Sequence, residues 1–388
     1  YWILGLQSVL RGPGLPVLPA PWHVHDVMAS MVFMLREFES EGQLGAVGQL
    51  DNASLLQTFL PAYGNPDPNV ALAMFADLRW INDPSAQTMI PSGAKGATEQ
   101  RLDPELAARI AAQPSMKAAA DGLRSWSENF HRQMEELNAR VKMGSYAWAI
   151  SGDKTATGNP MLYSGPEMGF LTPSIIAEGS IRGGGLEVSG MTLIGTPGFP
   201  IGRTPHHAWS MQVGHAHTVD FYVEAPQSVF LHRMETIKVF GGEDVVVPIF
   251  RSSHGPIIEP VPYDPSDPPD LIVAWAYGHW GKELGQGVET LLHLSRAESM
   301  AEFDAGIELF PVSQHTTYVD RDGNIAYWMS GYDPVRAAGV DPRLPSIADG
   351  TTEWTGERRP RVHDSNTPQG YYGGWNNKSA VDYDNATN

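Results

Sequence analysis

The chain has 388 residues, of which 42% are apolar and 18% charged, enough for two to three average domains or one large α+β domain. With 26 basic against 44 acidic residues, its formal net charge is −18, which argues against nucleic acid and anionic membranes as partners. The absence of cysteine excludes disulfides, cysteine-ligated zinc and thiol catalysis in this stretch.

The sequence contains no apolar run of the roughly 18 residues that a membrane-spanning helix needs. The best candidate, residues 27–35, is too short and is followed by Arg36 and Glu37. The chain begins at Tyr1 without a signal peptide, and we expect it to be an internal fragment of a longer precursor.

Helices are predicted for the first part of the chain. Apolar residues predict helices over 24–39 and 67–81, and a clearer one over 115–141, because they recur there at steps of three and four. The stretch 90–101 has the composition of an exposed linker.

Strands are predicted from Ser145 onward, so that the first 144 residues are mainly helical and the remainder mainly β. The glycine run 183–185 lacks the Lys-Ser/Thr ending of a phosphate loop and predicts a tight turn. The predicted strands are 146–150, 162–165, 186–195, 220–224, 229–240, 244–250 and 324–331.

Histidine pairs raise the possibility of a metal site. The pairs are His23 with His25, His206 with His207, and His215 with His217. The last pair alternates on a predicted strand beside Asp220, so both imidazoles could share a face, as a metal-dependent hydrolase would require. We favour surface or core histidines, because no HExxH spacing occurs. No GxSxG motif occurs either, which argues against an α/β-hydrolase.

Ser145 follows Gly144 at the boundary between the helical and β-rich parts. Cleavage before it would place a hydroxyl and a free α-amine on one residue, which is a nucleophile with a built-in base. The surrounding motifs SGPEMGF (164–170), LEVSGMTLIGTPGF (186–199), DPRLP (341–345) and GYYGGWNNK (370–378) resemble the penicillin acylase family of N-terminal nucleophile hydrolases. PWHVHDVM (21–28) and LRWINDPSAQTMI (78–90) extend the resemblance upstream.

The resemblance implies an α+β fold, a four-layer αββα sandwich built by two subunits from one precursor. It implies that 1–92 ends the small subunit, that 93–144 is a spacer propeptide, and that 145–388 begins the large subunit. Autoproteolysis would cut between Gly144 and Ser145. The resemblance implies neither a membrane nor nucleic acid as a partner. It implies a periplasmic or secreted location.

The resemblance also assigns roles to single residues. Ser145 is the expected nucleophile, and the backbone N–H of Val213 and the side-chain amide of Asn376 are the expected oxyanion donors. Glu167 falls where some members orient the free amine; it could hold the ammonium form by charge, or it could be merely exposed. Met168, Ile201 and Met211 match acyl-pocket positions, although core packing explains them equally well.

A structural calcium often bridges the subunits in this family. Asp220 and the carbonyls of Val219 and Pro334 match its ligands, but the other ligand positions hold Gln49, His217 and Thr387. Calcium prefers several hard oxygen ligands, usually with more than one carboxylate. We therefore expect no cofactor.

The leading hypothesis is an amidohydrolase that cleaves a linear amide into an acid and an amine. Its small-molecule substrate could be a penicillin side chain, an N-acyl-homoserine lactone or a lipopeptide. An unprocessed, inactive relative that acts as a binding protein is the alternative from a different class.

Overall fold

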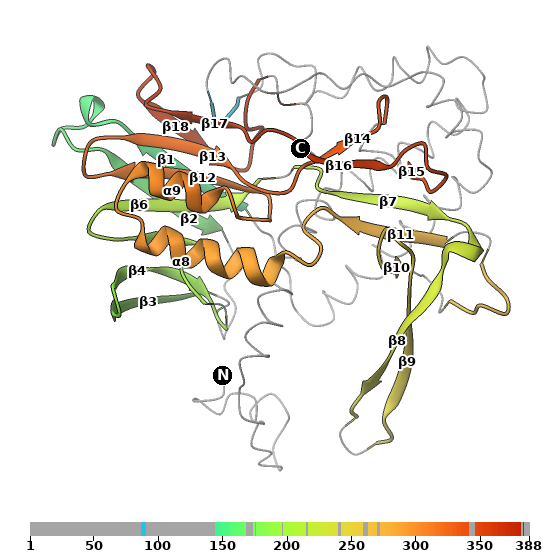
Figure 1. Ribbon diagram of the computed structural model, residues 1–388. Helices are drawn as coiled ribbons and strands as arrows, with labels where there is room; N and C mark the ends of the chain where they lie inside the picture. The colour runs from blue at the N-terminus through green and yellow to red at the C-terminus, as the bar shows by residue number, and fades with distance from the viewer. Residues whose placement is uncertain are drawn as a thin grey trace.

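The computed structural model describes residues 87–90, 144–167, 174, 176–195, 197–214, 216–239, 242–258, 263–269, 272–340, 346–381 and 383. The helices predicted over 24–39, 67–81 and 115–141 lie outside these residues, as does most of the predicted small subunit and spacer. The description below therefore concerns mainly the β-rich part of the chain (Figure 1).

An antiparallel sheet of seven strands lies at the centre of the described part, in the order β17-β13-β12-β6-β5-β4-β3. The glycine run 183–185 forms the predicted tight turn between β3 and β4, with all three residues at positive φ. The strands are β3 (Ile176–Gly183), β4 (Leu186–Leu193), β5 (Ile201–Arg203), β6 (His207–Val213), β12 (Gln314–Asp320), β13 (Ile325–Met329) and β17 (His363–Ser365).

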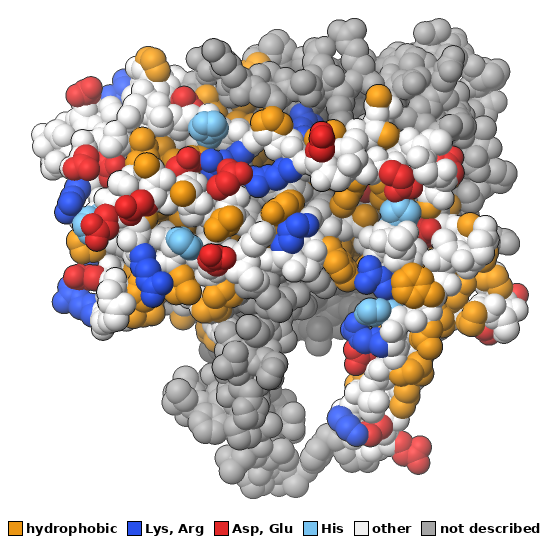
Figure 2. Space-filling model, viewed as in Figure 1, with side chains coloured by type: hydrophobic (Ala, Val, Ile, Leu, Met, Phe, Trp, Pro, Cys, Tyr) orange, Lys and Arg blue, Asp and Glu red, His pale blue; other side chains and the backbone are white. Residues whose placement is uncertain are grey.

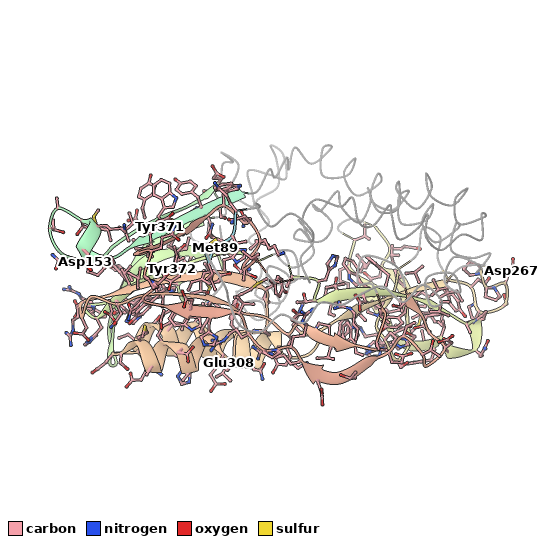
Figure 3. All side chains as sticks on the ribbon, turned by 90° about the horizontal axis from the view of Figure 1, so that it is seen from above. Met89, Asp153, Asp267, Glu308, Tyr371 and Tyr372 are labelled. Carbon is pink, nitrogen blue, oxygen red and sulfur yellow. The ribbon has the colours of Figure 1, made fainter. Side chains whose placement is uncertain are left out.

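A three-stranded antiparallel sheet covers one face of the central sheet, in the order β18-β1-β2. Its strands are β18 (Tyr371–Gly374), β1 (Gly144–Ile150) and β2 (Met161–Glu167), with the short helix η1 (Gly152–Lys154) between β1 and β2. Strands β1 and β2 pack on β6 and β12. Ala149 and Tyr372 point into the core between the sheets, whereas Tyr371 is exposed on the outer face (Figure 3).

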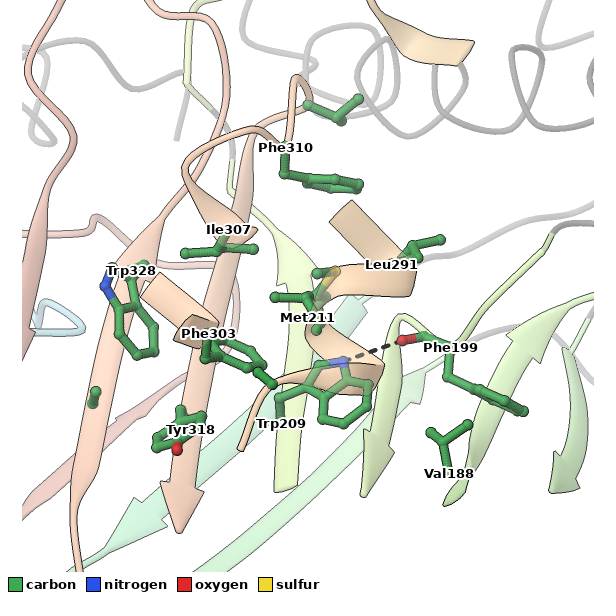
Figure 4. Packing of buried hydrophobic residues seen from close by; sticks show 14 residues of the cluster. Val188, Phe199, Trp209, Met211, Leu291, Phe303, Ile307, Phe310, Tyr318 and Trp328 are labelled. Carbon is green, nitrogen blue, oxygen red and sulfur yellow. Dashed lines mark hydrogen bonds between the residues drawn. The ribbon is translucent and has the colours of Figure 1, made fainter. Parts of the chain in front are cut away.

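Two helices cover the opposite face of the central sheet: α8 (Val288–Arg296), which continues a π-helical turn η3 (Glu283–Gly287), and α9 (Met300–Ile307) (Figure 1). Side chains alternate along the strands, as β geometry requires, so that Trp209 and Trp328 face the helices while Ala208 and Tyr327 face the three-stranded sheet. Trp209 also donates from Nε1 to the carbonyl of Phe199 at 3.1 Å (Figure 4).

The part of the chain that the structure describes thus has three layers: the three-stranded sheet, the central sheet, and the helices α8 and α9. The sequence correctly predicted the β character of this part but not its two helices.

A second group of strands lies beside the sandwich. It comprises the sheet β10-β11-β7-β15, the pair β14-β16 and a projecting two-stranded ribbon, β8-β9, which carries exposed apolar side chains (Figures 1 and 2). The strands are β7 (Val219–Glu224), β8 (Phe230–Ile237), β9 (Val245–Arg251), β10 (Ile257–Ile258), β11 (Ile272–Tyr277), β14 (Pro334–Arg336), β15 (Ser346–Ile347) and β16 (Trp354–Arg358); η2 (Pro226–Ser228) precedes β8.

Candidate active site

Ser145 lies at the start of β1, between β2 and the end of β18. Ala147 is paired with Gly374 in the antiparallel register, so continuing the register by two residues places Asn376 opposite Ser145. Strand β18 ends at Gly374, so Ser145 has no backbone partner from that strand, and the side chain of Asn376 takes this role. Its Oδ1 accepts a hydrogen bond from the backbone N–H of Ser145 at 2.8 Å.

Asn376 has a φ of 67°, a left-handed conformation that asparagine adopts more readily than most residues. Its Nδ2 donates to the carbonyl oxygen of Val213, at the end of β6, at 2.8 Å. The structure therefore brings together Ser145, Val213 and Asn376, three residues that are far apart in the sequence. The contact at Val213 is made by its carbonyl oxygen, whereas the expected oxyanion donor is its N–H.

The hydroxyl of Ser145 lies against the peptide bond at which cleavage is expected. Its Oγ donates to the carbonyl oxygen of Gly144 at 2.7 Å. Gly144 is paired with Glu167 across β1 and β2, and a Cβ added at Gly144 would lie 2.6 Å from Oε2 of Glu167. The carboxylate is thus beside the Gly144 backbone, and the exposed side chain of Glu167 belongs to the same site.

The structure describes two of the three residues predicted to line the acyl pocket. Met168 lies outside the described residues. Ile201 is half-buried in β5, paired with Met191 of β4. Met211 is buried in the core between the central sheet and α8 (Figure 4), on the face where core packing accounts for it.

Asp220, the candidate calcium ligand, is buried in an ion pair with Arg336. The guanidinium contacts both carboxylate oxygens, with Nε to Oδ2 at 2.7 Å and Nη2 to Oδ1 at 2.9 Å. Nη2 also donates to the carbonyl oxygen of His217 at 2.6 Å, and Nε1 of Trp354 donates to Oδ2 of Asp220 at 2.5 Å. Both side chains of the ion pair are almost fully buried.

The Arg336 guanidinium occupies the position beside Asp220 where the family resemblance would place a calcium ion. Burial by itself disfavours a charged guanidinium, but the charge and hydrogen bonds of Asp220 raise the pKa of Arg336 above its ordinary value. Val219 and Pro334 lie beside Asp220 and Arg336 in β7 and β14, whereas Gln49 and Thr387 lie outside the described residues. The residues present do not fit a calcium ion.

The histidines that the structure describes do not gather into a metal centre. Nε2 of His207 lies 2.9 Å from the carbonyl oxygen of Leu294, and burial lowers the pKa of His207 to about 4, as in a neutral core histidine. The predicted strand through His217 is wrong, because β6 ends at Val213 and β7 begins at Val219. Within the described ranges, no three His, Asp or Glu side chains form a possible metal site. His215 and the pair His23 and His25 lie outside them.

Sequence reasoning missed two features around the site. One is Arg336, whose proximity to Pro334 is the only signal that the sequence offered. The other is Asn377, which follows Asn376 in the sequence and is 4% exposed. Its contacts depend on the distant segment Gln87–Ile90, which no local pattern could connect to it.

Comparison with known proteins identifies the family. The family model described as penicillin amidase matches residues 9–387, so the chain belongs to the penicillin amidase family. Penicillin G acylase of Escherichia coli is 26% identical over 409 residues, which cover 94% of this chain and 46% of that protein. The acyl-homoserine lactone acylase QuiP of Pseudomonas aeruginosa is 24% identical over 281 residues, covering 65% of this chain and 32% of QuiP.

A solved structure, that of a thermostable penicillin G acylase from Alcaligenes faecalis, is similar with a TM-score of 0.56 and 28% sequence identity. The similarity covers 62% of this chain and 46% of the other. The chain spans less than half the length of each of these relatives. Among the described helices, none is long and apolar enough to cross a membrane.

Proposed function

We propose that the protein is an amidohydrolase that uses Ser145 as an N-terminal nucleophile. The observation that carries this proposal is the hydrogen-bonded connection of Ser145 to Asn376 and of Asn376 to Val213, each at 2.8 Å. Family membership supports the same chemistry, since the matched relatives include acylases by name. A serine in an ordinary turn would not account for a connection between three such distant segments.

The first step is cleavage of the bond between Gly144 and Ser145. Oγ of Ser145 attacks the carbonyl carbon of Gly144 and loses its proton, which passes to the Ser145 nitrogen as the C–N bond breaks. The acyl group thereby moves from nitrogen to oxygen as an ester. Water then hydrolyses the ester, which leaves a carboxylate on Gly144 and a free amine on Ser145. The contact of Oγ with the Gly144 carbonyl oxygen at 2.7 Å supports this step.

In turnover, the freed amine of Ser145 takes the hydroxyl proton while Oγ attacks the substrate amide. Donors aimed at the resulting oxyanion stabilise it, and we assign this role to the side-chain amide of Asn376 and the backbone N–H of Val213. The amine product leaves with a proton, and water releases the acid from the acyl-enzyme. Oδ1 of Asn376 orients the Ser145 nitrogen, and Glu167 lies near enough to the cut end to attract the new ammonium group.

Cleavage is tested by mass spectrometry and N-terminal sequencing of the expressed precursor. We expect a chain that begins SYAWA from the wild type and an uncut precursor from Ser145→Ala. Ser180→Ala, at an exposed serine in β3, is the matched control and should be cut normally. A wild-type precursor that never splits would refute the mechanism and leave a binding homologue as the better interpretation.

The proposed substrate class is a linear acyl amide. The names of the relatives support a penicillin side chain and an N-acyl-homoserine lactone as candidates. A lipopeptide is a third candidate, which rests on the family resemblance alone. Release of a primary amine from penicillin G and from an N-acyl-homoserine lactone, compared by kcat/KM, tests the first two. The pocket assignment of Met168, Ile201 and Met211 belongs to this proposal.

No calcium is proposed for the Asp220 site. This proposal rests on the contacts of Arg336, whose guanidinium binds both carboxylate oxygens of Asp220 and the carbonyl oxygen of His217. Arg336 supplies the positive charge that a bound metal ion would bring to Asp220.

The remaining proposals concern the whole protein. A fourth, helical layer would complete an αββα sandwich by covering the outer face of the β18-β1-β2 sheet, where Trp148 and Tyr163 are 46% and 56% exposed. The two expected subunits are 1–92 and the chain from Ser145, after loss of 93–144. A periplasmic or secreted location is inferred from family resemblance and is tested by cell fractionation.

A further inference from the structure

A turn closed by a side chain holds the backbone of Asn376. The side chain of Asn377 folds back across this turn, and its Oδ1 accepts a hydrogen bond from the backbone N–H of Trp375 at 2.9 Å. Asn376 lies between the two bonded residues, at its φ of 67°. The conformation that directs the Asn376 amide at Ser145 and Val213 is therefore closed by the side chain of Asn377.

The other half of the Asn377 amide reaches a distant part of the chain. Its Nδ2 donates to the carbonyl oxygen of Gln87 at 3.0 Å. Both ends of this amide are used, and the side chain is 4% exposed. Removing it would take away both of these partly buried hydrogen bonds, which hold the turn closed and join it to Gln87.

The segment Gln87–Ile90 runs along the chain that follows Asn376. The N–H of Met89 donates to the carbonyl oxygen of Lys378 at 2.9 Å, and that of Ile90 to Ser379 at 3.0 Å. Met89 and Ile90 are 0% and 2% exposed, in the core between the two sheets.

Met89 and Asn377 pack so closely against Gly374 that no side chain would fit there. A Cβ added at Gly374 would overlap both Oδ1 of Asn377 and Sδ of Met89. The segment therefore packs directly against the turn.

We infer that Asn377 is a positioning residue for the oxyanion donor Asn376, and that Gln87–Ile90 holds Asn377 in place. The inference rests on the proposed function, and it adds a role for the small subunit. Gln87–Ile90 precedes the expected spacer, whereas Asn377 follows the expected cleavage site. After cleavage, the end of one chain would set the geometry of a catalytic group in the other.

A double-mutant cycle in the full-length protein tests this inference. The probe is whichever of penicillin G and the N-acyl-homoserine lactone is turned over, and kcat and KM are measured on cleaved enzyme counted by active-site titration. We expect Asn376→Ala to lower kcat by about 10²–10³-fold. Asn377→Ala should lower kcat by up to about 10²-fold with little change in KM, because it misplaces a donor without touching the substrate.

In the Asn376→Ala background, Asn377→Ala should lower kcat almost no further. If instead the two losses multiply, Asn377 does not act through Asn376 and the inference is wrong. If Asn376→Ala leaves kcat unchanged, it is the proposed oxyanion role that fails. Asn159→Ala, at an exposed asparagine beyond η1, is the control and should leave kcat unchanged.

Asn377→Asp provides a second readout if the alanine variant folds poorly. A carboxylate keeps an acceptor for Trp375 but opposes the carbonyl oxygen of Gln87, whereas a protonated carboxyl group can donate to it. The ratio of variant to wild-type kcat should therefore rise as the pH falls. A ratio that is independent of pH would contradict the contact with Gln87.

Discussion

At the scale of single residues, the pair of Arg336 and Asp220 shows how one side chain can replace an expected ligand. A buried carboxylate needs a partner, because an unpaired charge in the interior is strongly unfavourable. A bidentate guanidinium matches the two carboxylate oxygens in geometry as well as in charge. The pair therefore makes a prediction about stability and about calcium.

Arg336→Met should lower the free energy of unfolding by about 3–5 kcal/mol, because it leaves the buried Asp220 unpaired. Calorimetry or urea unfolding in the uncut Ser145→Ala background measures this loss on a single chain. Arg182→Met is the matched control. It breaks an exposed ion pair with Glu187, whose side chains are 81% and 52% exposed, and should change stability by less than about 1 kcal/mol.

The same pair predicts that calcium does not stabilise the wild-type protein. Added calcium and a calcium chelator should both leave the melting temperature unchanged, since a ligand raises stability only where it binds the folded state. A rise in melting temperature with calcium concentration would overturn the proposal that Arg336 takes the place of the metal ion.

At the scale of elements, His254 joins three parts of the second group of strands. Its Nδ1 lies 2.6 Å from Glu224 of β7, and its Nε2 lies 2.7 Å from Glu353, just before β16. The imidazole stacks on the ring of Tyr222 at 4.0 Å. Burial disfavours the imidazolium, but hydrogen bonds to both carboxylates raise the pKa of His254 above its usual 6.5.

The sign of the pH dependence follows from these shifts. A raised histidine pKa gives stability that is complete below pH 6.5 and is lost as the pH rises through the folded-state value. Burial opposes ionisation of Glu224, but its bonds to His254 and two serines lower its pKa below 4.5. Its contribution is present above pH 4.5 and is lost in more acidic solution.

We therefore expect His254→Gln to cost about 1–2 kcal/mol near pH 6 and clearly less near pH 9. Urea unfolding of both proteins at the two pH values, again with Ser145→Ala, measures the difference. His293→Gln removes a histidine that is 55% exposed and should show little effect at either pH. An equal loss at both pH values would show that the ion pairs with His254 are not what stabilises this junction.

The strands were predictable from sequence because their alternation is local. The segments around Tyr146, Leu162 and Ala326 all form strands where period-two patterns predicted them. The helices α8 and α9 were missed because they are only nine and eight residues long. Their apolar residues, such as Leu291 and Phe303, act mainly by packing on the central sheet, which sequence periodicity does not reveal.

The candidate site was predictable only through family resemblance. A serine after a predicted helical segment and an asparagine in a predicted turn carry little signal alone. The register that places Asn376 opposite Ser145 depends on a strand pair between residues far apart in the sequence, and such pairing cannot be derived from local pattern. Arg336 and Asn377 were missed for the same reason.

At the scale of the whole molecule, the four residues Gln87–Ile90 connect the first part of the chain to the last. Met89 is completely buried against Gly374 and the core between the two sheets, so this contact should support the assembly as well as the site.

Met89→Ala should lower the free energy of unfolding by about 2–5 kcal/mol, because it opens a cavity between the two sheets. Unfolding of the uncut Ser145→Ala protein measures the loss, and gel filtration of the cleaved protein should show weaker retention of the small subunit. Met234→Ala, on the β8-β9 ribbon where the side chain is 54% exposed, should change stability by about 0.5 kcal/mol or less. If the two methionine variants are equally stable, the packing of Met89 does not stabilise the folded protein, and the two expected chains are held together elsewhere.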